Sequence, residues 1–176
     1  MHRLATPLVM LLAFAGSAPA YAEAAPMPDC HAPEHRQFDF WLGHWTVTGP
    51  KGKVAGDSRI ESILDGCAVQ ETWTGASGNR GKSLNLYNRA LGAWEQFWID
   101  SSGDRLLLRG GLRGDAMVLD NVHEAGTDAR RERITWTALA DGGVRQLWEM
   151  SMDGGATWKV EFDGLYTRVM DVDRVD

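Results

Sequence analysis

The chain has 176 residues, and its 24 acidic side chains outnumber its 18 Lys and Arg side chains, which gives a formal net charge of −6. This balance argues against nucleic acid and anionic membranes as partners, because both reward clustered Lys and Arg. The length suits one domain with a substantial core and is short for two.

The first 22 residues have the layout of a secretory signal peptide. Arg3 precedes an apolar run from Leu8 to Ala15, and an A-x-A cleavage pattern stands at 20–22. The apolar run is too short to cross a bilayer as a helix. We therefore exclude residues 1–22 from the fold and expect a periplasmic or secreted protein without stable membrane insertion.

Two cysteines, Cys30 and Cys67, remain in this exported chain. Such a pair is more often bonded than free in an oxidising compartment. We predict a disulfide between the N-terminal lead-in (23–37) and the turn before the third strand, and by chain entropy its loop closure contributes roughly 4 kcal/mol. The alternative is a metal site made from Cys30, His31, His35 and His44. That cluster lacks a second Cys-x-x-Cys or a carboxylate partner, so no metal is predicted.

The segment 38–45, FDFWLGHW, concentrates large apolar side chains at the start of the domain. Pro-Glu at 33–34 suits the first turn of a helix. Phe38, Trp41 and Leu42 recur at three- and four-residue spacing, which places them on one face of a short helical segment. We expect this face to plug one end of a β-barrel.

From Gly43 onward, turn residues interrupt the chain at short, fairly even intervals and leave about ten segments. Most segments are rich in β-branched and aromatic residues, and several alternate with period two, which is typical of half-buried strands. Short connections require antiparallel neighbours, and closing the sheet protects its edges. We predict an all-β fold for residues 38–170, an up-and-down antiparallel β-barrel of about ten strands, followed by a tail at 171–176. A two-sheet sandwich is the alternative.

Three consecutive segments, 69–73, 83–87 and 94–100, each carry a mixed row of polar and aromatic side chains on one face. Alternation puts the two rows of a strand on opposite faces without saying which faces inward. We assign the mixed rows to the interior, because exposing their tryptophans would leave a large apolar patch and because rings with a few polar groups are typical of ligand pockets. The predicted ligand-binding residues are Glu71, Trp73, Ser83, Asn85, Tyr87, Trp94, Gln96, Trp98 and Asp100.

The competing interpretation is that these side chains fill the interior and satisfy one another, which leaves no cavity. The opposite row carries Leu84, Leu86, Phe97 and Ile99. In our assignment that row lies outside and needs cover from the lead-in or from a partner. Trp136 and Trp148 extend the ring surface on later strands, but the pattern does not assign their direction.

Residues 151–158 match Ser-x-Asp-x-Gly-x-Thr-Trp, the Asp-box pattern of sialidases and related propellers. There the Ser, Asp and Thr hold a tight hairpin turn by local hydrogen bonds, and the motif repeats from blade to blade. Here it occurs once. It therefore predicts a hairpin between the ninth and tenth strands and no glycan chemistry.

Several motifs together resemble a poorly characterised family of exported bacterial proteins with a lipocalin-like (calycin-like) or nitrobindin-like barrel. They are FDFWLGHW, with a Gly-x-Trp similar to that of the first lipocalin strand, Glu71-x-Trp73, Ser83-x-Asn85-x-Tyr87, Trp94-x-Gln96-x-Trp98-x-Asp100 and the Asp-box pattern. The resemblance implies the barrel and no particular activity. Nitrobindin-type barrels bind haem through a histidine near the C-terminus, whereas the last histidine of this chain is His123. No cofactor is therefore predicted.

The leading functional prediction is an exported protein that binds a small, partly aromatic or apolar ligand. The rings supply stacking area, and Ser83, Asn85 and Gln96 fix the ligand's orientation. Glu71 and Asp100 would pair with a cationic or hydroxylated group. The alternative is an acid–base enzyme of isomerase or cyclase type, in which these two carboxylates have pKa values pushed apart. A third class is an interaction module that docks its ringed face on a partner.

Overall fold

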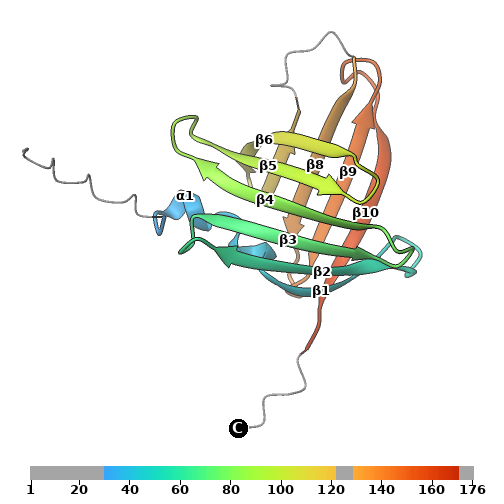
Figure 1. The fold of residues 1–176 in the computed structure, drawn as a ribbon. Coiled ribbons are helices and arrows are strands. Elements are labelled where there is room, and N and C mark those ends of the chain that lie inside the picture. Colours follow the sequence, from blue (N-terminus) through green and yellow to red (C-terminus); the bar gives the residue numbers. More distant parts are fainter. Residues whose placement is uncertain (1–29, 122–128, 171–176) are drawn as a thin grey trace, which may run out of the picture.

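The computed structural model describes residues 30–121 and 129–170. The predicted signal peptide at 1–22, residues 23–29 of the lead-in and the tail at 171–176 lie outside the described residues. Within the described part, the strands close into one barrel in the order β1-β10-β9-β8-β7-β6-β5-β4-β3-β2, with antiparallel neighbours throughout (Figure 1). The predicted all-β, up-and-down barrel is confirmed, and the sandwich alternative is wrong.

The elements follow the predicted segments closely. They are α1 (Pro33–Arg36), the 3-10 helix η1 (Asp39–Trp41), β1 (Gly43–Thr48), β2 (Val54–Ile63), β3 (Ala68–Gly75), β4 (Arg80–Asn88), β5 (Ala93–Asp100), β6 (Arg105–Arg113), β7 (Ala116–Asp120), β8 (Arg131–Ala138), β9 (Val144–Ser151) and β10 (Lys159–Arg168). Neither helix of the described part is long and apolar enough to span a bilayer.

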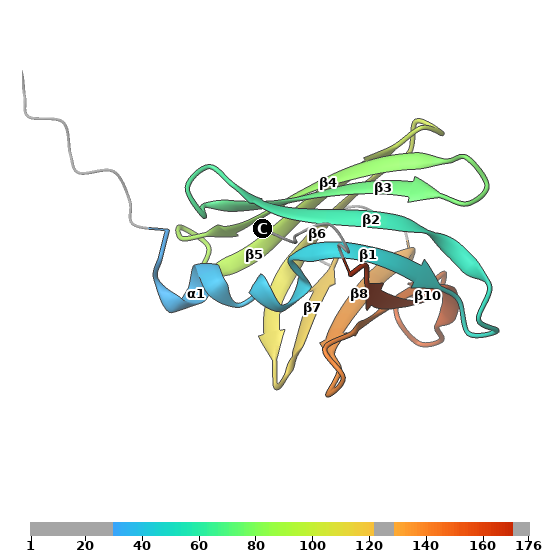
Figure 2. The same ribbon diagram turned by 90° about the horizontal axis from the view of Figure 1, so that it is seen from below.

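The two ends of the barrel differ. The turns after β2, β4, β6 and β8 lie at the end where β1 begins, which we call the plugged end. The turns after β1, β3, β5 and β9 lie at the opposite end, which we call the open end. In Figure 2, α1 and the residues that follow it lie beside the start of β1, at the plugged end.

The lead-in, which we extend to include residues 38–42, plugs the barrel with aromatic rings, as predicted. Phe38 and Trp41 are fully buried, and their ring centroids lie 4.9 Å apart in a stacked arrangement. The Phe38 ring also meets Trp94 of β5 and Trp136 of β8 edge to face, at 5.6 and 5.1 Å. Leu42 is partly buried against the same cluster. The plug therefore contacts the barrel wall at β5 and at β8 and fills this end with ring surface.

The predicted disulfide between Cys30 and Cys67 is present, with 4.9 Å between the two Cα atoms. It ties the lead-in to the turn between β2 and β3. Cys30 is therefore not available as a thiolate metal ligand, so the structure contradicts the alternative metal site built on it.

The predicted Gly-x-Trp joins the lead-in to the first and last strands. Trp45 is fully buried, and its Nε1 donates a hydrogen bond to the Trp41 carbonyl at 2.9 Å. The Arg168 guanidinium of β10 lies over the Trp45 ring at 4.3 Å and donates to the Leu42 carbonyl at 3.1 Å. Gly43 has φ of 146°, and a Cβ there would lie 2.5 Å from Arg168 Nη1. The positive φ favours glycine here, and the absence of a Cβ lets the Arg168 guanidinium lie over the tryptophan without shifting.

The Asp-box segment forms the predicted hairpin turn between β9 and β10. Ser151 Oγ donates to Asp153 Oδ1 at 2.7 Å, and Asp153 accepts from the Thr157 backbone N–H at 2.8 Å and from its hydroxyl at 2.6 Å. These bonds, led by the one from the Thr157 hydroxyl, hold the pKa of Asp153 well below its usual range. The Trp158 ring is covered by the Arg133 guanidinium at 4.1 Å. The turn is therefore held by its own side chains at the open end.

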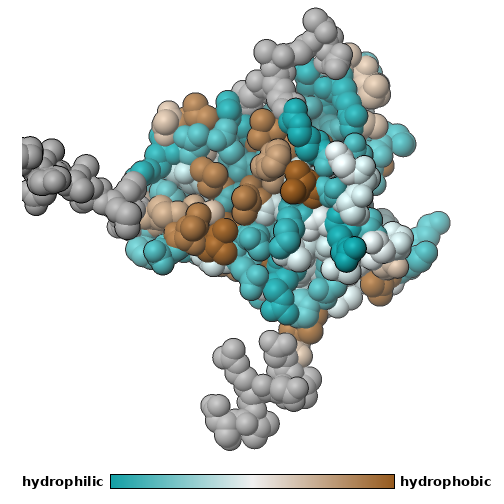
Figure 3. All heavy atoms as spheres, in the orientation of Figure 1, coloured by the Kyte–Doolittle hydropathy of each residue, from teal (hydrophilic) through white to brown (hydrophobic). Residues whose placement is uncertain are grey.

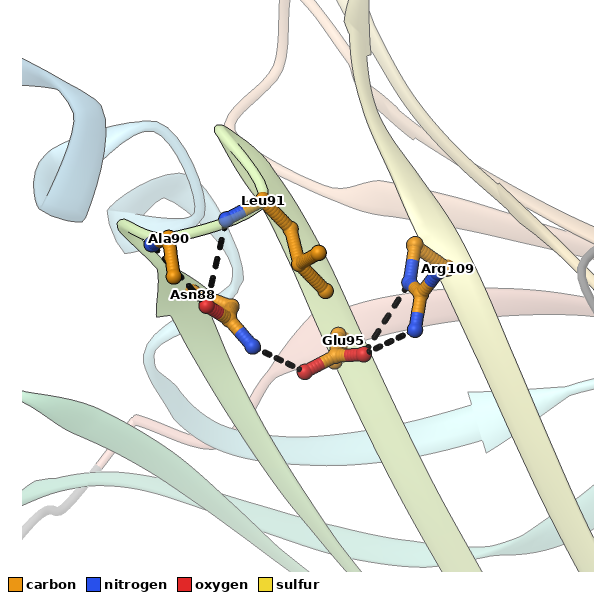
Figure 4. A network of polar contacts seen from close by, with 5 residues as sticks. All are labelled: Asn88, Ala90, Leu91, Glu95 and Arg109. Carbon is orange, nitrogen blue, oxygen red and sulfur yellow. Dashed lines mark hydrogen bonds and ion pairs between the residues drawn. The ribbon is translucent and has the colours of Figure 1, made fainter.

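On the outer face, polar contacts cross the strands. Glu95 of β5 accepts two hydrogen bonds from Arg109 of β6, at 3.0 and 2.7 Å, and one from Asn88 of β4 at 2.8 Å (Figure 4). Asn88 Oδ1 also accepts from the backbone N–H groups of Ala90 and Leu91 in the turn between β4 and β5. This network supports the register in which the predicted mixed row of β5 points inward.

We expect the plug to carry a large share of the stability. Phe38→Ala removes a ring that is 0% exposed, and the resulting cavity should lower the free energy of unfolding by roughly 3 to 5 kcal/mol. Phe97→Ala is the matched control, because that ring is 42% exposed and should cost less than about 1 kcal/mol. Urea unfolding of both variants and the wild type measures the difference, and equal losses would contradict the plug's role.

Candidate functional site

The predicted mixed rows of β3, β4 and β5 lie inside the barrel. Glu71, Ser83, Asn85 and Gln96 are each at most 4% exposed, and Trp73 and Trp94 are also buried. Tyr87, Trp98 and Asp100 are half-buried. Register explains the grouping, since Glu71 lies opposite Ser83, which lies opposite Trp98 on β5.

A pocket of about 150 Å³ occupies the open half of the interior. Its walls come from six strands, β3, β5, β6, β8, β9 and β10, and from the turn after β3. The lining residues are Glu71, Trp73, Asn79, Gln96, Trp98, Asp100, Leu106, Ile134, Gln146, Trp148, Phe162 and Tyr166. The interior is thus neither empty throughout nor filled throughout, because the plug occupies one half and the pocket lies in the other.

Of the predicted ligand-binding residues, five line this pocket: Glu71, Trp73, Gln96, Trp98 and Asp100. The other four do not line it. Trp94 packs against Phe38 and donates to Gln37 at 3.1 Å, and Tyr87 lies edge-on to His35 with 5.3 Å between ring centroids. These two belong to the plugged half. Ser83 and Asn85 lie behind Glu71 and act on it through hydrogen bonds.

The wall formed by β6, β8, β9 and β10 was not predicted from the sequence. The direction of Trp148 was left open, because the segment at 145–149 carries polar groups on both faces. The structure separates them. Arg145 pairs with Asp163 at 2.8 Å on the outer face, while Gln146 and Trp148 line the pocket. On both β5 and β9 a Gln is followed two residues later by a Trp, at 96 and 98 and at 146 and 148. This shared spacing is the sequence signal that marks the inward row of β9.

Glu71 is the acceptor at the end of a chain of hydrogen bonds across four strands. Gln96 Nε2 donates to Asn85 Oδ1 at 2.8 Å, and Asn85 Nδ2 donates to Ser83 Oγ at 3.0 Å. Ser83 Oγ donates to Glu71 Oε2 at 3.0 Å, and Ser58 Oγ of β2 donates to Glu71 Oε1 at 3.0 Å. The competing interpretation, in which interior polar groups satisfy one another, is therefore correct for Ser83 and Asn85. Glu71 differs from them because it also lines the pocket.

Burial changes the acidity of the groups beside the pocket. It raises the pKa of the Glu71 carboxyl from 4.5 to about 7, against the lowering effect of the hydrogen bonds from Ser58 and Ser83. Burial, together with the nearby charge of Glu71, raises the pKa of the Tyr166 phenol well above its usual value. Tyr166 donates its hydroxyl to Gln146 Oε1. The phenol therefore stays neutral, while Glu71 changes charge near neutral pH.

Asp100 lies at the mouth of the pocket and behaves differently. Hydrogen bonds from Ser102, with a smaller effect from the Trp98 indole, hold its pKa below the usual value. Trp98 Nε1 donates to Asp100 Oδ2 at 3.4 Å, and the Ser102 backbone N–H donates to Oδ1 at 2.8 Å. Asp100 is therefore an ionised carboxylate that also anchors the turn after β5.

Two glycines make room for the indoles of the pocket wall. A Cβ at Gly81 would lie 2.2 Å from Trp98 Cζ2, and one at Gly56 would lie 2.7 Å from Trp73 Cη2. The Trp73 ring also meets Phe162 edge to face, at 6.0 Å between centroids. Larger residues at either glycine would displace an indole, so these positions set the shape of the wall.

The rows opposite the pocket lie on the outer face. Leu84, Leu86, Phe97 and Ile99 are 40 to 47% exposed. Figure 3 shows hydrophobic side chains gathered over β4, β5 and β6. The described part of the lead-in does not cover this row, because it enters the barrel end and packs against the interior cluster. Cover by a partner stays a prediction.

The described residues contain no group of three His, Cys, Asp or Glu side chains able to hold a metal ion, and no histidine is among the lining residues of the pocket. Comparison of the sequence with protein-family models and with curated proteins finds no match. The functional assignment therefore rests on the geometry of the pocket.

We expect Glu71 to make the folded protein less stable as pH rises. Between about pH 5 and pH 8 the unfolded chain ionises this carboxyl first, since its folded pKa is raised to about 7. The free energy of unfolding should fall over this range by roughly 2 to 3 kcal/mol more in the wild type than in Glu71→Gln. Urea unfolding at both pH values measures this. The exposed Glu61→Gln should keep the wild-type dependence, and identical profiles for wild type and Glu71→Gln would contradict the assignment.

Proposed function

We propose that this protein is an exported binding protein that holds a small, partly aromatic or apolar molecule in the pocket at the open end. The observation that carries the proposal is a cavity walled by Trp73, Trp98, Trp148 and Phe162, with Glu71 and Gln96 among its polar groups. Rings with a few convergent polar groups are what small-molecule sites use for affinity and orientation. The pocket lies between the strands in the open half of the barrel, and Tyr166 separates it from the plug ring Trp41.

The size of the pocket limits the ligand. An engineered apolar cavity of about the same volume in an unrelated protein admits one benzene molecule. A cavity of about 150 Å³ therefore suits one ring or a short branched chain, with any further part of the ligand extending through the mouth. Indole faces stack well on such flat or compact groups.

Export is supported by three features. The first is the signal-peptide layout of residues 1–22. The second is the disulfide between Cys30 and Cys67, because such bonds persist in oxidising compartments. The motif resemblance to exported barrel proteins points the same way. We propose a periplasmic or secreted location on these grounds.

An acid–base enzyme is the second candidate, and one observation favours it. Glu71 and Asp100 line the same pocket with pKa values shifted in opposite directions, as an acid–base pair requires. We rank binding first because the other polar groups already have protein partners. Asp100 accepts hydrogen bonds from Ser102 and Trp98, and Tyr166 donates its hydroxyl to Gln146. Turnover of a bound compound that is lost in Glu71→Gln, with affinity retained, would favour the enzyme.

The binding function can be tested by filling the pocket. Leu106 lines it, while the neighbouring Leu107 is 40% exposed on the outer face. Leu106→Trp should weaken the binding of single-ring compounds such as indole and benzyl alcohol by about tenfold or more, because the new ring occupies their space. Leu107→Trp should bind as the wild type does. Calorimetric titration measures both, and equal affinities in the two variants would exclude this pocket as the site.

A further inference from the structure

We propose that the natural ligand is a compact organic amine whose ammonium group binds at Glu71 while its apolar body packs among the indoles. This inference rests on the proposed function and deepens it by naming the chemical class of the ligand.

The titratable groups of the pocket wall point to a cation. They are the carboxyl of Glu71, the carboxylate of Asp100 at the mouth and the phenol of Tyr166. Among the described residues that line the pocket, none is Lys, Arg or His. An anionic ligand would face two acidic groups and no counter-ion, whereas an ammonium ion would find a partner at the mouth and another deep in the pocket.

Glu71 lacks the cationic partner that other carboxylates of this barrel have. Glu95 pairs with Arg109, Glu149 with Arg133, and Asp163 with Arg145. Glu71 is 4% exposed, and its partners in the described chain are the hydroxyls of Ser58 and Ser83. A buried carboxylate is costly without a positive charge, so a ligand that supplies one removes this cost on binding.

The hydrogen bonds around Glu71 suit an ammonium donor. Each carboxylate oxygen accepts one bond from a serine hydroxyl, and the chain from Gln96 through Asn85 and Ser83 also donates toward it. A carboxylate has room for about four hydrogen bonds, and a primary ammonium brings three N–H donors. The remaining lone pairs of Glu71 can therefore receive the ligand without displacing a protein donor.

The rings of the pocket are also free to receive a cation. Elsewhere in the barrel, Arg168 lies over Trp45 and Arg133 over Trp158, so cations already cover indole faces in this protein. No such contact in the described chain involves the pocket rings Trp73, Trp98 and Trp148. Tryptophan is the ring that attracts a cation most strongly, and this attraction adds to the burial of the ligand's apolar part.

The test compares two ligands of the same shape on the purified full chain, benzylammonium and benzyl alcohol, by calorimetry. At about pH 8 we expect the wild type to bind the ammonium at least about tenfold more tightly, since a charged hydrogen bond replaces a neutral one. Glu71→Gln should lose this preference and still bind benzyl alcohol. Glu61→Gln removes the same charge from an exposed outer position and should keep the preference.

A pH comparison on the wild type needs no variant. The groups that face Glu71 are Ser58, Ser83 and Tyr166, and the phenol stays neutral over this range. The preference for the ammonium should therefore increase from about pH 6 to about pH 8 as Glu71 ionises around its pKa of about 7. A preference that does not change with pH would overturn the inference even if Glu71→Gln fails to fold.

The outcomes separate this inference from the proposed function. If benzyl alcohol binds as tightly as benzylammonium, or if Glu71→Gln keeps the full preference, the amine is excluded and the binding pocket stands. If neither compound binds to the wild type, the proposed function fails as well.

Discussion

Closure of one barrel end by aromatic rings is the constraint on which the rest of the structure depends. A barrel of this size can fill its interior with side chains or enclose a ligand. Here Phe38 and Trp41 occupy the plugged half, and Trp45 and Arg168 join the lead-in to both the first and the last strand. The plugged half supplies the apolar burial that stabilises the fold. The open half is consequently free to hold polar groups that contribute little to stability.

The boundary between the two halves is a polar layer, and its order determines the chemistry of the pocket. Gln96, Asn85 and Ser83 donate in sequence toward Glu71, so each buried amide and hydroxyl is satisfied by its neighbour. A chain of this kind polarises in one direction, which strengthens the hydrogen bond that Ser83 donates to Glu71 at its end. Burial acts against ionisation, and the balance leaves the pKa of Glu71 at about 7. A group poised in this way responds strongly to any charge that a ligand brings.

The sequence predicted the barrel, the disulfide, the plug and the inward row of β3 to β5, because each has a local signal. Period-two alternation and regular turns mark the strands, and Trp94, Gln96 and Trp98 mark a face. It did not predict which members of that row reach the pocket. Trp94 and Trp98 share one row of β5, yet the plug contacts the first and the second lines the cavity. That difference depends on how deeply the lead-in enters the barrel. The residue pattern of β5 alone does not predict this depth. The wall from β9 was missed because ion pairs such as Arg145 with Asp163 made its outer row as polar as its inner one.

Side-chain hydrogen bonds and close packing hold the open end where it meets the pocket, which supports the proposed recognition of a small molecule. Asp100 binds the turn after β5 through Ser102, and Asp153 binds the turn between β9 and β10 through Thr157. Gly81 and Gly56 let two indoles lie close against neighbouring strands, where any side chain would displace them. Rims and walls held in place before binding lose little conformational entropy when the ligand enters. A purely structural barrel would have no need to keep an uncompensated buried carboxyl beside such a wall, since an apolar side chain there would be more stable. The uncompensated carboxyl of Glu71 is therefore the feature that supports the proposed cationic ligand.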